Sequence, residues 1–145
     1  MGLMNHAVYQ VATKALLFDG GKILTLVTPD GYMDFPGGRV DESEVDLSWQ
    51  EALQREMIEE LGDRVTCTIG NYAFVSKRVW HHDGKRTNVA AIYFMANYTG
   101  GEITLSDEHR AYEWLTPAEI LSGKRTCMSP HEQSELTNFL QKNFT

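Results

Sequence analysis

The stretch between residues 37 and 62 constrains this chain of 145 residues more than any other part. Its second half, residues 48–61, contains no glycine or proline, and Gly62 follows as a stop signal. Ser48 is a typical N-cap residue, and Glu51 completes a capping box three positions later. The sequence therefore predicts a helix that begins after Ser48 and ends at Gly62.

Three glutamates gather on one side of this predicted helix. At about 100° per residue, Glu56, Glu59 and Glu60 fall within a sector of about 100°. Like charges at such positions repel each other by roughly 0.2–0.5 kcal/mol per pair, unless a cation lies between them. Carboxylate oxygens suit Mg²⁺, Mn²⁺ or Ca²⁺. The alternative is an ordinary solvated face, which acidic runs often form.

The residues around the acidic face favour a site. Gly37 and Gly38 follow a proline, and paired glycines let the backbone approach a ligand closely. Taken alone, this tripeptide is equally consistent with an ordinary turn. Arg55 precedes Glu56 directly and stands four residues before Glu59, so it can hold a carboxylate through charge-assisted hydrogen bonds.

Together these residues resemble the Nudix box, whose pattern is G-x5-E-x7-R-E-U-x-E-E-x-G-U with U apolar. Gly38 and Glu44 keep the first spacing. The second half of the pattern is matched by Arg55, Glu56, Met57, Glu59, Glu60 and Gly62. Two departures stand out: ten residues rather than seven precede Arg55, and Asp63 occupies the last apolar position. The extra residues precede the helix cap, so we expect a longer loop and an intact acidic helix.

The resemblance implies an α/β (α+β) fold, a Nudix-type α/β/α sandwich with a mixed β-sheet. It also implies Mg²⁺ or Mn²⁺ as cofactor. The metal ligands that it implies are the Gly37 carbonyl, Glu56, Glu59 and Glu60. Arg55 would orient one of these acids, and Glu44 would help to fix the loop.

The identity of the general base stays open between two residues. Glu59 is the first choice by its match to the Nudix pattern. Glu108 is the second, because family members often carry an acid in the loop before an aromatic strand, where it acts as an extra ligand or base. On its own, Glu108 reads as a surface carboxylate.

The substrate class implied is a nucleoside diphosphate linked to another moiety, cleaved at its pyrophosphate. The sequence does not choose among nucleotide sugars, ADP-ribose, dinucleotides and nucleoside triphosphates. Aromatic and basic residues outside the box could stack on a base or bind a phosphate. These substrate-binding candidates are Tyr32, Phe35, Arg39, Arg78 and Trp80. Each is equally consistent with a packing role.

Two other functions remain open: a nucleotide-sensing Nudix domain without catalysis, and an RNA 5′-end pyrophosphohydrolase. The intact acidic triplet argues against the first. The net charge of −7 argues against the second, because nucleic-acid binding favours a basic surface. The same charge argues against membrane binding.

Length and composition indicate one domain over residues 1–145, and a homodimer is compatible with them. The two cysteines, Cys67 and Cys127, cannot form a disulfide framework. The first fourteen residues lack the pattern of a secretory leader. We therefore expect a cytoplasmic protein.

The rest of the chain reads mainly as strands. Their expected ranges are 9–18, 22–27, 65–69, 72–80, 87–98, 102–105 and 111–115. A short helix is expected after the cap Thr116, and a closing helix from the cap Ser129 to about Lys142. Residues 81–86 read as a polar hairpin loop, either solvated or gripping a phosphate. Their adjacent histidines would point apart, which disfavours a shared metal.

Overall fold

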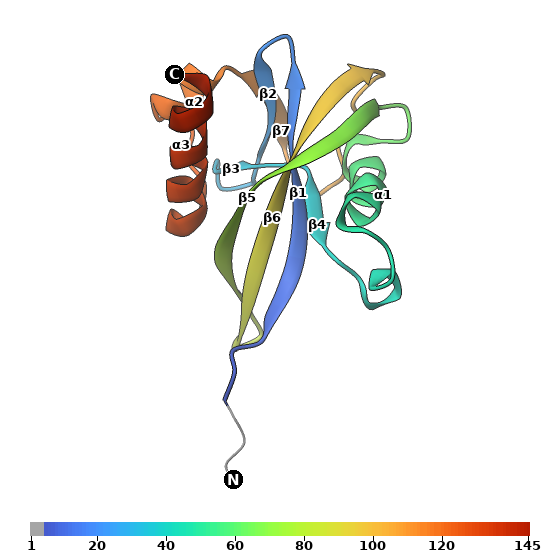
Figure 1. The fold of residues 1–145 in the computed structure, drawn as a ribbon, viewed down its shortest axis with the longest axis vertical. Coiled ribbons are helices and arrows are strands. Elements are labelled where there is room, and N and C mark those ends of the chain that lie inside the picture. The colour runs from blue at the N-terminus through green and yellow to red at the C-terminus, as the bar shows by residue number, and fades with distance from the viewer. Residues whose placement is uncertain (1–4) are drawn as a thin grey trace.

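A seven-stranded mixed sheet lies between one helix on one face and two helices on the other, as Figure 1 shows. The computed structural model describes residues 5–145; the first four residues, part of the stretch examined for a leader, lie outside the described residues. The strands are β1 (Tyr9–Asp19), β2 (Lys22–Val27), β3 (Met33–Asp34), β4 (Gly37–Arg39), β5 (Thr66–His82), β6 (Lys85–Gly100) and β7 (Ala111–Leu115). The helices are α1 (Trp49–Leu61), α2 (Pro117–Leu121) and α3 (Pro130–Phe144), with a 3-10 turn, η1 (Glu42–Glu44). The predicted sandwich is confirmed.

The sheet is mixed because β1 runs parallel to β6 and antiparallel to its other partners. The main strand order is β3-β2-β1-β6-β5, while β4 pairs with β1 and β7 with β2. One edge of β1 changes partner along its length: residues 12–14 pair with β4, and residues 18–19 pair with β2. The sheet therefore divides beside the middle of β1.

Each face of the sheet has its own hydrophobic core. On one face, Leu53, Met57 and Leu61 of α1 are buried against apolar residues of β1, β2 and β6. On the other face, Leu136 and Leu140 of α3 are buried against a separate cluster. The buried residues of each helix recur at helical spacing, so each helix presents one apolar face to the sheet.

The helix caps form as predicted. Ser48 accepts a hydrogen bond from the Glu51 amide, and the reciprocal bond completes a capping box. Thr116 caps α2 in the same way. Ser129 caps α3, and Pro130 occupies its first turn. No helix within residues 5–145 is long and apolar enough to cross a membrane.

Two predicted elements are wrong. Residues 70–71, expected to separate two strands, lie inside the continuous strand β5, because the register shift between Ile69 and Tyr72 absorbs them as a bulge. Residues 102–105, expected to form a strand, have none. Their backbone bonds to the end of α1 instead: the Thr104 amide donates to the Leu61 carbonyl and the Ser106 amide to the Glu60 carbonyl.

The polar hairpin loop is shorter than expected. Pairing between β5 and β6 continues through His81 with Arg86 and His82 with Lys85. Asp83 and Gly84, both with positive φ, form the tight turn.

Candidate active site

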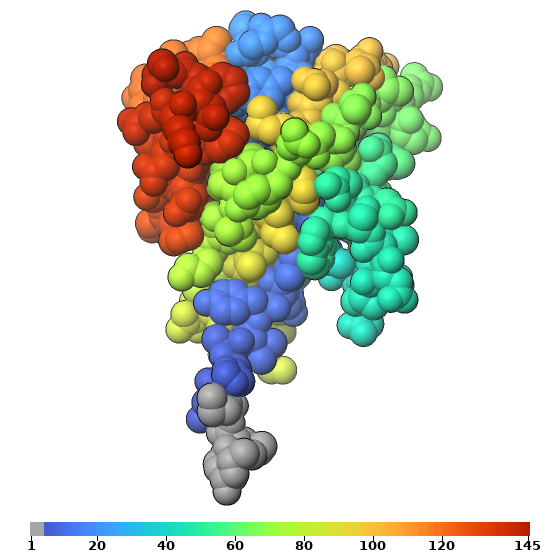
Figure 2. Space-filling model, viewed as in Figure 1, coloured from blue at the N-terminus to red at the C-terminus, as the bar shows by residue number. Residues whose placement is uncertain are grey.

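A cleft of about 1500 Å³ extends over the divided part of the sheet, from the acidic side of α1 to the first residues of α3. In Figure 2 the segment that contains η1 and α1 stands away from the lower strands and leaves a hollow between them. The cleft is lined by predicted site residues from several elements: Gly37, Arg39, Glu56, Glu60, Arg78 and Glu108.

Arg55 bonds to three glutamates at the wall of this cleft. Its guanidinium contacts Glu44 through Nε and, at 2.8 Å, through Nη2. Nη2 also donates to Glu56 at 2.8 Å, and Nη1 donates to Glu59 at 2.5 Å. Glu44 in turn accepts the Asp41 amide at 2.8 Å, so Arg55 ties the glycine-side loop to α1.

The longer loop leaves this arrangement intact. Asp41 caps η1 and forms a capping box with Glu44, which places the buried Glu44 carboxylate under Arg55. The residues between this turn and α1, numbers 45–47, are exposed. The insertion therefore lengthens the surface loop without displacing the acids.

The two glycines of β4 fit where larger residues would not. Gly37 has φ +137°, and a Cβ there would lie 1.9 Å from the Thr13 carbonyl oxygen. A Cβ on Gly38 would lie 2.7 Å from the Glu56 carboxylate. The loop thus reaches the first acid of the triplet by direct contact, which explains why both positions are glycine.

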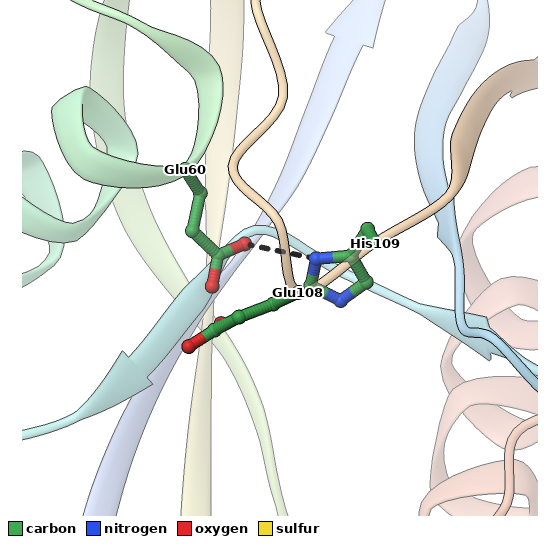
Figure 3. Close-up of side chains that lie close together, drawn as sticks. All are labelled: Glu60, Glu108 and His109. Atoms are coloured by element: carbon green, nitrogen blue, oxygen red, sulfur yellow. Dashed lines mark ion pairs between the residues drawn. The ribbon is translucent and has the colours of Figure 1, made fainter.

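Glu60, Glu108 and His109 meet in the same cleft. One potential ligand atom from each lies within 4.8 Å of the others. Figure 3 shows Glu60 reaching from α1 toward the loop that carries Glu108 and His109; the Glu60 Oε2 to His109 Nδ1 distance is 3.9 Å. Although Glu60 Oε2 is buried, it has no hydrogen-bond partner among the described residues.

Burial governs the protonation of these acids. It raises the pKa of Glu60 to about 7, despite the opposing charges of Lys14 and His109. Burial also raises the pKa of Glu56, against the influence of Arg55. An unpartnered buried carboxylate beside further oxygen and nitrogen donors fits a divalent cation, which would satisfy Glu60 without a hydrogen bond.

Two residues that the sequence analysis missed, Asp34 and Lys14, support this cluster through His109. Asp34 accepts hydrogen bonds from Lys14 at 3.1 Å, and its other oxygen lies 3.1 Å from His109 Nε2. Burial works to raise the pKa of Asp34, yet Lys14, His109 and Arg78 together hold it well below its usual range. The available signal was Lys14 itself, the one charged residue among the buried positions 12–17 of β1.

Two of the predicted substrate-binding residues pair with each other. The Arg39 guanidinium lies 3.9 Å from the centre of the Trp80 ring, and its Nη1 donates to Gln10 at 2.8 Å. Trp80 is 41% exposed and also stacks on His82. Arg39 and Trp80 both line the cleft, so they are positioned to contact a ligand.

The other three predicted substrate-binding residues are less available to a ligand. Arg78 lines the cleft, but its Nε donates to Glu132 at 2.8 Å, so much of its guanidinium is engaged. Phe35 is 0% exposed and packs edge-on against Tyr93. Its ring has no surface on which a base could stack, because the adjacent strand β3 directs it into the α3-side core. Tyr32 is exposed and lies outside the cleft.

Comparison with known proteins gives a consistent result. A family model described as the NUDIX domain matches residues 8–137. The MutT protein from Methanosarcina mazei Go1 is 26% identical, with a TM-score of 0.73 over 94% of this chain and 96% of that one. The ORF135 protein of E. coli is 25% identical, with a TM-score of 0.73 over 99% of this chain and 96% of that one.

A third similarity is partial. The U8 snoRNA-decapping enzyme of Xenopus laevis is 36% identical over 85 residues, which are 55% of this chain but only 39% of that enzyme. The chain therefore spans well under two thirds of this relative's length. With the family match over residues 8–137, the fold and the acidic helix behind its glycine loop, the chain belongs to the Nudix family.

Proposed function

We propose that this protein is a metal-dependent hydrolase that cleaves the pyrophosphate linkage of a nucleoside diphosphate joined to another moiety. The observation that carries the proposal is the buried, unpartnered carboxylate oxygen of Glu60, which faces Glu108 and His109 in the cleft. Burying such an oxygen without a partner costs roughly 1–3 kcal/mol or more, and a bound cation would remove that cost.

Glu56, Glu59, Glu60 and the Gly37 carbonyl would hold Mg²⁺ or Mn²⁺, with Glu108 alongside. The bound cation would neutralise the diphosphate, polarise phosphorus and help to activate water. Arg55 holds the carboxylates of Glu56 and Glu59 in place, so that they need not be reoriented when the substrate binds.

A proton acceptor for the attacking water is available at two positions. Glu59 is exposed and hydrogen-bonded to Arg55, whereas Glu108 has no hydrogen bond or ion pair among residues 5–145. We favour Glu108 on this ground, since its carboxylate can accept a proton without first giving up a partner. Comparison of Glu59→Gln with Glu108→Gln decides between them: the true base should lose more kcat.

Arg39 and Trp80 would contact the nucleotide at the outer part of the cleft. An arginine stacked on an exposed indole presents a cation beside an aromatic edge, which suits a phosphate next to a base or sugar. The remaining volume allows a second moiety beyond the diphosphate, as in a nucleotide sugar, ADP-ribose or a nucleoside triphosphate.

A second candidate is hydrolysis of a capped or triphosphorylated RNA 5′ end. The partial identity to the decapping enzyme favours it. The net charge of −7 opposes it, because RNA binding relies on phosphate contacts with basic residues. We also propose a cytoplasmic location, which the two free cysteines, Cys67 and Cys127, support.

The decisive experiment is product analysis on a substrate panel with Mg²⁺ or Mn²⁺. The panel contains nucleotide sugars, ADP-ribose, dinucleotides, nucleoside triphosphates and a short capped RNA, each with an EDTA control. We expect metal-dependent products from at least one small nucleotide. Cleavage of the RNA alone would favour the second candidate, and nucleotide binding without any turnover would indicate a sensing domain.

A further inference from the structure

One carboxylate, that of Asp34, is bonded both to the segment that leads into Gly37 and to His109, which lies beside Glu60. Its Oδ1 accepts the Phe35 amide at 2.8 Å and the Lys14 ammonium at 3.1 Å. Its Oδ2 lies 3.1 Å from His109 Nε2. Asp34 thus connects the segment that leads into Gly37 with the segment that carries Glu108.

The first connection fixes the approach to the glycine pair. Lys14 is buried in β1 and donates to the Phe35 carbonyl at 3.2 Å as well as to Asp34. The next residue, Ala15, donates its amide to the Pro36 carbonyl at 2.9 Å. Asp34 and its neighbours therefore hold the backbone immediately before Gly37 against the middle of β1.

The second connection fixes the imidazole between two acids. His109 lies with Nε2 toward Asp34 and Nδ1 toward Glu60, at 3.1 and 3.9 Å. Because Glu108 is the adjacent residue, an anchored His109 ring also limits where the Glu108 backbone can lie. Figure 3 shows the three side chains converging from α1 and this loop.

Asp34 does not belong to the group of potential cation ligands, which comprises Glu60, Glu108 and His109. It also lies 3.8 Å from Arg78, whose guanidinium is bonded to Glu132 of α3. We propose that Asp34 is a positioning residue that fixes both loops around the cation site. This inference rests on the proposed metal-dependent function.

The main test is Asp34→Asn, which keeps the size of the side chain but removes its charge. Outer partners of metal ligands typically contribute about 10–100-fold to metal affinity or activity. We expect Mn²⁺ binding, measured by calorimetry on the protein without substrate, to weaken by about tenfold or more. At saturating Mn²⁺, kcat should fall while the KM for nucleotide stays within about twofold, because Asp34 acts through His109 rather than on substrate.

Asp30→Asn is the matched control, since Asp30 is an exposed residue in the preceding turn. It should leave Mn²⁺ affinity and kcat unchanged. Lys14→Gln removes the other Asp34 connection and no potential ligand; it should also weaken Mn²⁺ binding, and it keeps the proposal testable if Asp34→Asn fails to fold. His109→Gln removes the connection to Asp34 together with one potential ligand, so it is used only for its coupling to Asp34→Asn. In a double-mutant cycle, the pair of changes should weaken Mn²⁺ binding less than the product of the two single effects.

Three results would overturn the proposal: unchanged Mn²⁺ affinity in folded Asp34→Asn, fully additive effects in the cycle, or a loss confined to the KM for nucleotide. The last result would place Asp34 in the substrate site. The Mn²⁺ readout separates this proposal from the proposed function. Suppose that Mn²⁺ binding weakens in Asp34→Asn but the unaltered protein turns over no substrate. The positioning role of Asp34 would then be supported, and the proposed hydrolase activity would be rejected.

Discussion

Two charged networks border the cleft, and they differ in how their charges balance. Beside α1, the single guanidinium of Arg55 pairs with Glu44, Glu56 and Glu59, and Glu60 stands nearby with an unpartnered oxygen. Three carboxylates therefore share one arginine, and Glu60 beside them has only His109, at 3.9 Å, and the charge of Lys14 to oppose its own. Such an excess of negative charge is unfavourable in a partly buried site unless a cation binds.

The network beside α3 is balanced. Lys14 and Arg78 face Asp34 and Glu132, and Tyr93 donates to the second oxygen of Glu132 at 2.6 Å. Every carboxylate in it has a charged or hydroxyl partner. The comparison teaches that the balanced network needs no ligand to neutralise its charges, although Asp34 within it also reaches His109, whereas a bound cation would stabilise the unbalanced network. The predictions that follow test this distinction.

The largest effect is expected at Glu60. Glu60→Gln removes the buried charge that a cation would need, and should lower kcat by about 10²–10³-fold or more. Its circular dichroism spectrum should stay unchanged. The exposed Glu102→Gln is the matched control and should keep full activity. A folded and active Glu60→Gln would refute the assignment of the acidic site.

A change in the balanced network should affect stability instead. Glu132→Ala leaves Arg78 and the buried Tyr93 hydroxyl without their partner. Since breaking a buried pair costs about 3–5 kcal/mol and Arg78 is partly exposed, we expect unfolding to become easier by about 2–4 kcal/mol in urea titrations. The Mn²⁺ affinity of the folded fraction should change little. If Glu132→Ala lowered Mn²⁺ affinity as strongly as it lowered stability, the two networks would not differ in function.

Arg55→Lys tests whether the unbalanced network needs the hydrogen bonds of the arginine as well as its positive charge. A lysine keeps the charge but cannot bond to three carboxylates in one plane. We expect kcat to fall by about 10–100-fold, as for other residues that orient metal ligands. Arg64→Lys, a change at an exposed position, provides the control. Unchanged kcat would show that a positive charge at position 55 is enough for activity, without the hydrogen bonds from the guanidinium to the three glutamates.

The smallest effect concerns pH. Because burial raises the pKa of Glu60 to about 7, protons compete with the cation below that pH. Mn²⁺ affinity should therefore rise with pH from about 6 to 8, by about tenfold or less per pH unit. Calorimetry in buffers of different ionisation heat measures both the affinity and the protons released.

The raised pKa of Glu60 has the opposite effect on the stability of the metal-free protein, which should fall as the pH rises. A carboxyl whose folded pKa exceeds its unfolded value stabilises the fold at low pH, and this contribution is lost as pH rises toward 7. Thermal unfolding in EDTA should show this loss between about pH 4.5 and 7, and Glu60→Gln should lack it. A metal-free stability curve that is identical in the variant would contradict the buried position of Glu60.

The sequence by itself determined the parts of the site that depend on local rules. Ser48, Glu51 and Gly62 set the limits of α1 through capping, and the spacing of its residues set the acidic and apolar faces. These features depend on neighbours within about one helical turn, so a pattern in the chain is sufficient.

Only the tertiary structure decided the rest, because it depends on contacts between distant segments. Asp34 meets Lys14 across 20 positions and His109 across 75. Phe35 lies in the core because pairing of β3 with β2 places its ring on the α3 side of the sheet. Residues 102–105 lose their expected strand because the end of α1 offers free carbonyls, which satisfy their amides instead of a neighbouring strand.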